Sequence, residues 1–175
     1  MIQIQKFKQL CTLTTALLCF SLASCEPKGR VLESSNEFGG QTLVEENFKK
    51  SRLKLRKVYF DGAGVKRKED RYPVDEAIAN LGFSYQQVTY DDGGKITADL
   101  REAPEDLPNE FGYLSFLRTY GPGKKILTGE VVFKTAKAKK IGYTSSIIHY
   151  NQKGRPEKVF YYDLNKKLIY SGPAK

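Results

Sequence analysis

Three aspartates and one histidine are the residues best suited to acid–base or metal chemistry. Asp61, Asp91 and Asp92 stand next to glycines, and His149 is the only histidine in the sequence. A calcium loop needs several oxygen ligands in a frame of about twelve residues and usually a distal glutamate, and no such frame surrounds these aspartates. We therefore expect the aspartates to form turns. One histidine cannot supply a histidine-based metal site, so we expect His149 on the more exposed face of a strand, with no metal and no cofactor.

The segment from Gly121 to Lys125 has the glycine and lysine content of a phosphate-binding loop. It lacks the G-x-x-x-x-G-K-[ST] spacing, and Ile126 follows where a hydroxyl is needed. We interpret the segment as a rigid turn between two strands.

Two basic runs could contact a polyanion. In the first run, Arg52, Lys54 and Arg56 alternate with leucines, so a strand would place three cations on one face. Such a stripe could bind an anionic surface with about 1 kcal/mol per cation, or it could be a solvated outer face. The second run consists of Lys134, Lys137, Lys139 and Lys140.

The elements that carry these residues are β-hairpins at a regular interval. Phe60, Tyr90, Tyr120 and Tyr150 are spaced 30 residues apart, and each is followed by turn-forming residues. A further copy begins at Tyr162. An aspartate or asparagine leaves the strand, a glycine supplies positive φ, and a second strand follows. Successive hairpins of this kind predict a mainly β fold, an antiparallel meander.

These hairpins resemble the tyrosine–aspartate repeats of bacterial surface and toxin-associated proteins, and also the Y-x-x-G-K hairpins of MORN-like repeat proteins. The resemblance covers residues 53–72, 85–100, 117–133 and 147–170. It implies a repetitive antiparallel sheet that acts as a scaffold, with no catalytic residues to carry over.

One helix interrupts the β pattern. Pro73 suits a first helical turn, and Asp75 and Glu76 suit the positive end of the helix dipole. With Gly82 as the C-cap, the pattern predicts a short helix over 74–81. We expect the following segment, 103–112, to be a long loop.

The N-terminus has the layout of a secretory signal peptide. Lys6 and Lys8 precede an uncharged, largely apolar run that ends in Leu22-Ala23-Ser24-Cys25. This ending resembles the lipobox of bacterial lipoproteins, which implies cleavage before Cys25 and lipidation of that cysteine with palmitate-type acyl chains. The alternative is an N-terminal apolar helix with an ordinary buried cysteine. The predicted organisation is a signal peptide over 1–24, a flexible tether over 25–41 and one β-rich domain over 42–175.

This processing limits the chemistry of the mature chain. All three cysteines lie within the first 25 residues, so cleavage would leave no free thiol and no disulfide. The formal charge of +9 would fall to +7 with the loss of Lys6 and Lys8. Because the chain is expected to be exported, nucleic acid is not an expected partner. We expect the cell envelope as its location, and Glu26 after the lipidated cysteine favours the outer membrane in enteric-type bacteria.

The sequence therefore predicts a non-catalytic binding or scaffold module on a membrane anchor. Its partner would be an anionic envelope polymer, lipid headgroups or a protein. One alternative is an inhibitor or immunity-type lipoprotein that neutralises a toxin or a cell-wall hydrolase. Another is an envelope hydrolase that uses carboxylates, which would require paired acidic groups in a deep cleft.

Overall fold

The computed structural model describes residues 30–33, 35–48, 52–106 and 112–174. The predicted signal peptide and Cys25 lie outside these residues. The sheet is carried by the unit Val31–Lys175. β1 and the first residues of β2 fall within the range predicted as a tether.

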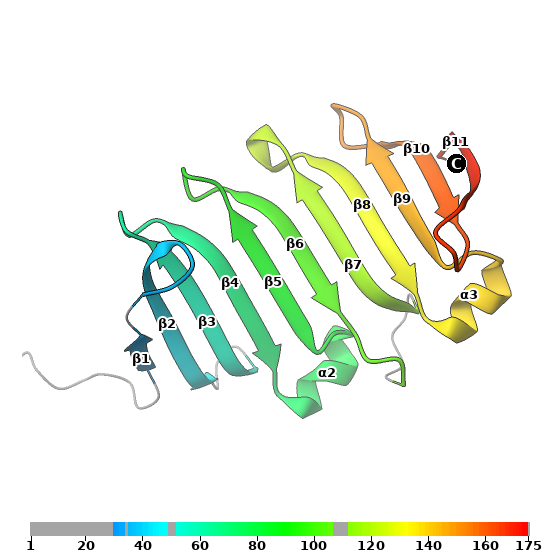
Figure 1. Ribbon diagram of the computed structural model, residues 1–175. Coiled ribbons are helices and arrows are strands. Elements are labelled where there is room, and N and C mark those ends of the chain that lie inside the picture. Colours follow the sequence, from blue (N-terminus) through cyan, green and yellow to red (C-terminus); the bar gives the residue numbers. More distant parts are fainter. Residues whose placement is uncertain (1–29, 34, 49–51, 107–111, 175) are drawn as a thin grey trace, which may run out of the picture. The chain divides into compact units, whose positions relative to one another are not determined.

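The described residues form one sheet of 11 strands whose order in space is their order in the chain (Figure 1). The ladders from β2 to β11 are all antiparallel, so the predicted mainly β meander is confirmed. The strands are β1 Arg30–Glu33, β2 Gly39–Phe48, β3 Leu53–Asp61, β4 Lys66–Pro73, β5 Tyr85–Tyr90, β6 Ile96–Glu102, β7 Tyr113–Tyr120, β8 Ile126–Phe133, β9 Ser145–Tyr150, β10 Pro156–Tyr162 and β11 Leu168–Pro173.

The hairpin turns use Asp61 and Asp91 as predicted, whereas the side chain of Asp92 pairs with Arg67. Asp61 Oδ1 accepts hydrogen bonds of 2.9 Å from the backbone N–H groups of Ala63 and Val65. The same pattern recurs at Asp91, Asn151 and Asp163. The segment from Gly121 to Lys125 is also a turn, built on the short 3-10 helix η2, Pro122–Lys124.

The structure repeats every 60 residues, twice the interval seen in the sequence. The predicted helix is present as α2, Asp75–Leu81, and a second helix that was not predicted, α3, Thr135–Ile141, begins 60 positions after it. Each helix ends at a glycine with positive φ, Gly82 at 73° and Gly142 at 84°. The two repeats are residues 53–102, which contain β3–β6, and residues 113–162, which contain β7–β10.

The sheet has two faces, which we name A and B. Directly paired residues share a face, and residues alternate between faces along a strand. Val58, Glu69 and Val88 pair in register on face A and are buried. Tyr59 and Lys68 pair on face B.

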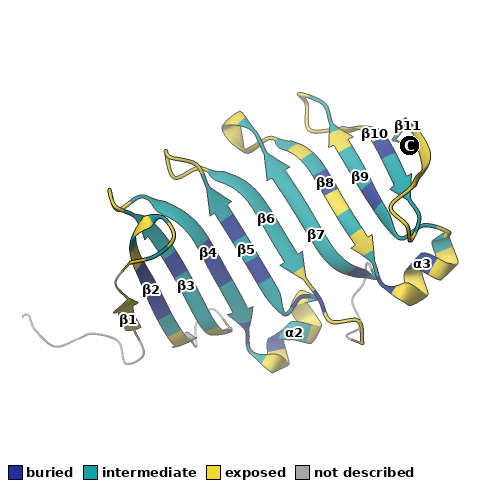
Figure 2. Ribbon diagram, viewed as in Figure 1, coloured by how far each residue is buried: buried dark blue, intermediate teal, exposed yellow. Residues whose placement is uncertain are grey.

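The sheet is a single layer. Among the described residues, the extensive contacts between elements all join strands that are neighbours in the sheet. Figure 2 shows buried positions within the strands, whereas the turns, much of both helices, β1 and parts of β8 are exposed. In such a sheet, cross-strand side-chain pairs supply much of the stabilisation, and among the described residues no second layer of strands covers either face.

Candidate binding surfaces

An ion-pair ladder crosses face A of the first repeat. Arg56 on β3 lies between two carboxylates, with Nη1 at 2.7 Å from Glu45 Oε2 and Nε at 2.8 Å from Glu69 Oε1. Arg71 on β4 binds the same Glu69 oxygen through Nε at 2.6 Å. These three strands are therefore joined by charge as well as by backbone hydrogen bonds.

The ladder continues through β5 to β6. Arg71 Nη1 donates to Gln86 Oε1 at 3.3 Å, and Gln86 Nε2 donates to Asp99 Oδ1 at 2.8 Å. Arg101 Nη2 lies 3.2 Å from Asp99 Oδ2. The ion-pair ladder consists of Glu45, Arg56, Glu69, Arg71, Gln86, Asp99 and Arg101.

Glu69 is the centre of this ladder, with a side chain only 1% exposed. Burial alone would raise the pKa of its carboxyl group, but hydrogen bonds from Arg71, Arg56 and Lys66 outweigh burial and hold the pKa far below its usual value. The carboxyl group also accepts a hydrogen bond from the hydroxyl of Tyr90. Its four partners make Glu69 a structural anion.

The three cations of the predicted stripe have different surroundings. Arg52 precedes β3, is exposed and has a φ of 56°. Lys54 Nζ lies 3.2 Å from the exposed carboxylate of Asp75, a surface pair that contributes little stability. Arg56 belongs to the ion-pair ladder, so its charge is already balanced by two carboxylates. The structure does not bring the three together as one set of free cations, and anion binding by this segment stays a prediction.

The other residues singled out for chemistry lie at turns or on exposed strand positions. Asp91 and Asp92 are exposed, and Asp92 forms an ion pair with Arg67. His149 is exposed, as predicted, and its ring centroid lies 5.2 Å from that of Phe160. Among the residues that the structure describes, no three His, Cys, Asp or Glu side chains are grouped so that they could hold a metal ion.

An aromatic and cationic cluster occupies face B where the first repeat meets the loop before β2. Lys68 Nζ lies 4.1 Å from the centroid of the Tyr59 ring and 5.9 Å from that of Phe38. Asn36 fixes the loop that carries Phe38, because its Nδ2 donates to the backbone oxygen of Phe60 at 2.9 Å. The cluster therefore brings together residues from two parts of the chain.

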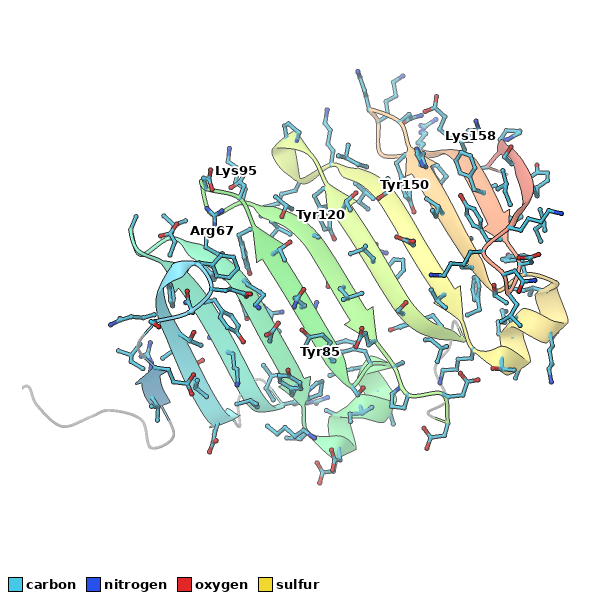
Figure 3. All side chains as sticks on the ribbon, in the orientation of Figure 1. Arg67, Tyr85, Lys95, Tyr120, Tyr150 and Lys158 are labelled. Carbon is cyan, nitrogen blue, oxygen red and sulfur yellow. The ribbon has the colours of Figure 1, made fainter. Side chains whose placement is uncertain are left out.

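Asp70 organises the tyrosines beside this cluster. It accepts hydrogen bonds from the hydroxyl of Tyr85 at 2.9 Å and from Gln87 Nε2 at 3.1 Å. Burial, followed by hydrogen bonding to Asp70, raises the pKa of both Tyr59 and Tyr85. The ring of Tyr72 lies 5.1 Å from that of Tyr85, which Figure 3 labels near the lower ends of β4 and β5. We name this set the Tyr59 surface: Phe38, Tyr59, Lys68, Asp70, Tyr72 and Tyr85.

A second aromatic group lies on the second repeat. The rings of Tyr143 and Tyr161 stack with centroids 4.1 Å apart, and Tyr161 stacks on Tyr170 of β11 at 5.4 Å. Tyr161 stands 60 positions after Arg101 and takes its place on face A. Equivalent positions of the two repeats thus hold an ion pair in one and an aromatic stack in the other.

The sequence patterns did not identify the ion-pair ladder, the Tyr59 surface or the aromatic stack. Each depends on the register between strands, and Phe38 lies in the segment predicted as a tether. The only signal in the sequence was the abundance of tyrosine and lysine.

Comparisons with known proteins give no family for this chain. No protein-family model matches the sequence, and no curated protein matches it. None of the helices in the described part of the chain is long and apolar enough to cross a membrane.

Proposed function

We propose that this protein is a non-catalytic binding or scaffold module, held at the bacterial cell envelope by lipid on Cys25. The observation that supports binding is the Tyr59 surface. Its tyrosines are half-buried: Lys68 contacts the Tyr59 ring, Asp70 binds the Tyr85 hydroxyl, and Tyr72 packs against Tyr85. Tyrosine offers a large amphipathic contact area at a low entropic cost, and side chains already held in place lose less entropy when a partner binds.

The positions of the acidic residues support a non-catalytic role. The carboxylate of Asp61 accepts backbone hydrogen bonds within its own turn, and so does that of Asp91. Glu69 is surrounded by cations. A hydrolase that uses two carboxylates would need a pair of acids facing a substrate, and these groups have structural partners instead.

The anchor is tested on the native protein. Mass spectrometry of chain purified from its own membranes is expected to show an N-terminus at Cys25 that carries acyl mass. A Cys25→Ala variant is expected to keep its signal peptide and to lose processing. An intact Met1 without added acyl mass would contradict the envelope proposal.

The binding role is tested by affinity capture from envelope extract. Wild-type protein is compared with Tyr72→Ala, which alters the Tyr59 surface, and with His149→Ala, an exposed change on the second repeat. We expect Tyr72→Ala to reduce capture of the main partner and His149→Ala to leave it unchanged. Equal capture by all three proteins would contradict a role for this surface. If the partner proved to be a single toxin or cell-wall hydrolase bound tightly, the inhibitor function would replace the scaffold function.

A further inference from the structure

The two repeats have the same fold and very different charge. Residues 53–102 contain nine basic and nine acidic residues, whereas residues 113–162 contain ten basic and two acidic residues. The net charges are therefore 0 and +8. Because the backbone is the same, the fold does not require this excess of cations, and the first repeat serves as an internal reference for the second.

The contrast is sharpest in the two helices. α2 carries Asp75 and Glu76 and no basic residue, whereas α3 carries Lys137, Lys139 and Lys140 and no acidic residue. All three lysines are exposed, and no ion pair forms at their side chains among the described residues.

The turn between β10 and β11 adds more cations and an exposed apolar residue next to α3. The backbone N–H of Thr144, just after α3, donates to the oxygen of Tyr162, just before the turn, at 2.9 Å. The turn carries the exposed Lys166 and Lys167 and also Leu164, whose exposure of 83% is the highest among the large exposed hydrophobic residues described. Figure 1 shows α3 beside the turn between β10 and β11. We name the group of residues that these two segments carry the α3 corner: Lys137, Lys139, Lys140, Leu164, Lys166 and Lys167.

Two nearby acids lower the net charge of the α3 corner without pairing with its lysines, among the described residues. Glu105 Oε1 accepts a hydrogen bond of 2.8 Å from the backbone N–H of Thr135. Asp163 Oδ1 accepts 2.9 Å hydrogen bonds from the backbone N–H groups of Asn165 and Lys167. Both carboxylates bind backbone N–H groups, and the five lysines of the corner still outnumber these two acids.

We propose that the α3 corner lies against the anionic headgroups of a lipid bilayer, with its lysines near phosphates and Leu164 in the interface. Lysines close to an anionic bilayer attract it additively, and an exposed leucine among them gains by entering the interface. A protein partner fits this composition less well, because the buried centres of protein interfaces favour arginine and are depleted of lysine. The proposal rests on the proposed function, since the lipid anchor would keep the domain beside a bilayer.

The absence of tryptophan from the sequence gives a clean optical test. In the full-length chain, a Leu164→Trp variant carries one tryptophan at the α3 corner. With vesicles of phosphatidylcholine and phosphatidylglycerol, we expect its emission to shift to the blue and to be quenched by brominated lipids. With vesicles of phosphatidylcholine alone, we expect the emission of a tryptophan exposed to water. The matched control is Ala63→Trp, in the exposed turn between β3 and β4 at the opposite ends of the strands. Its emission should stay that of tryptophan in water with both kinds of vesicle.

The charge contribution is tested by giving α3 the residues of α2. In the Leu164→Trp chain, Lys137→Ala, Lys139→Ala and Lys140→Asn introduce the residues found 60 positions earlier, so the helix should still form. We expect the anionic lipid concentration for half-maximal shift to rise on the order of 100-fold. The control removes the same charge from the turns at the opposite ends of the strands, through Lys124→Ala, Lys125→Ala and Lys153→Ala. It should raise this lipid concentration only a few-fold. Raising the salt concentration from about 0.1 M to about 1 M should abolish the shift, because the Debye length falls from about 10 to about 3 Å.

Two results would overturn the proposal. One is emission from the Leu164→Trp variant that is the same with anionic and neutral vesicles, and the other is equal weakening by the two triple variants. Circular dichroism of each variant checks that the sheet is retained. The vesicle test does not depend on lipidation, and mass spectrometry of Cys25 does not depend on the α3 corner. Failure of either proposal can therefore be recognised separately.

Discussion

The hydroxyl of Tyr90 donates a hydrogen bond of 3.1 Å to Glu69 Oε2, a carboxylate on the neighbouring strand. The equivalent tyrosine of the second repeat, Tyr150, lies over Gly129, where an added Cβ would be 3.4 Å from its hydroxyl. Figure 3 labels Tyr150 near the upper end of β9. One backbone arrangement is thus stabilised in two ways, by a buried ion network in the first repeat and by close packing of a ring on backbone in the second.

Replacing Glu69 with glutamine is expected to destabilise the protein strongly. The substitution keeps the shape of the side chain and leaves Arg56, Arg71 and Lys66 without their shared anion. Breaking a buried ion pair by removing one partner costs about 3 kcal/mol. Urea denaturation should show this loss in the free energy of unfolding. The control is Glu130→Gln, at an exposed position on β8, which should change it by less than about 0.5 kcal/mol. Similar effects of the two substitutions would contradict a stabilising role for the ladder.

Acid should weaken the protein through the same carboxyl group. Burial opposes ionisation of Glu69, but hydrogen bonds from Arg71 and Arg56 lower its pKa in the folded state. The unfolded state, with a glutamate pKa of about 4.3, therefore takes up a proton first. The stability contributed by Glu69 is present above this pH and is lost as the pH falls below it, toward the depressed folded pKa. The difference in unfolding free energy between wild type and Glu69→Gln should shrink from pH ~7 to pH ~3. A constant difference would show that Glu69 does not cause the dependence.

Alkali should act through the tyrosines around Asp70. Burial raises the pKa of Tyr59 and Tyr85, and hydrogen bonding to Asp70 raises it further. Their contribution to stability is complete below the ordinary tyrosine pKa of about 10 and is lost as the pH rises through the raised folded value. Tyrosinate absorbance should therefore show a late fraction, meaning tyrosines that ionise only well above the ordinary pKa. This fraction should appear together with loss of the circular dichroism of the sheet. Tyr85→Phe should reduce this late fraction, and in denaturant all tyrosines should titrate together near pH ~10. If Tyr85→Phe removed an early-titrating tyrosine instead, the hydrogen bond to Asp70 would not be the cause.

The sequence was sufficient to predict the hairpins because their determinants are local. Asp61 and Asp91 bind the backbone of their own turns, so a few adjacent residues specify each one. The predicted helix at 74–81 also had local signals, with Pro73 before it and acids in its first turn. α3 has neither a proline nor acids at its start, which explains why it was missed and why the interval of 30 residues was not recognised as half of a longer repeat.

The binding surfaces could not be predicted in the same way because they depend on pairing between strands. Arg56 and Glu69 are 13 positions apart in sequence, and only the register of β3 with β4 brings their side chains together. Without that register, the alternation of side chains along β3 alone predicts a stripe of cations made of Arg52, Lys54 and Arg56. Acidic residues on neighbouring strands decide which of these charges are balanced.

Two glycines on the sheet should respond in opposite ways to alanine. At Gly40, an added Cβ would overlap the backbone carbonyl oxygens of Phe60 and Asp61, which cannot move without opening the hairpin. We expect Gly40→Ala to lower the free energy of unfolding by about 2 kcal/mol. At Gly129, the added Cβ would lie in ordinary contact, 3.4 Å from the hydroxyl oxygen of Tyr150 and 3.5 Å from its Cε2. Because alanine also restricts the unfolded chain, Gly129→Ala should be neutral or stabilise by about 0.5 kcal/mol. Urea denaturation of both variants measures the difference, and a larger loss at Gly129 than at Gly40 would contradict the packing described for both strands.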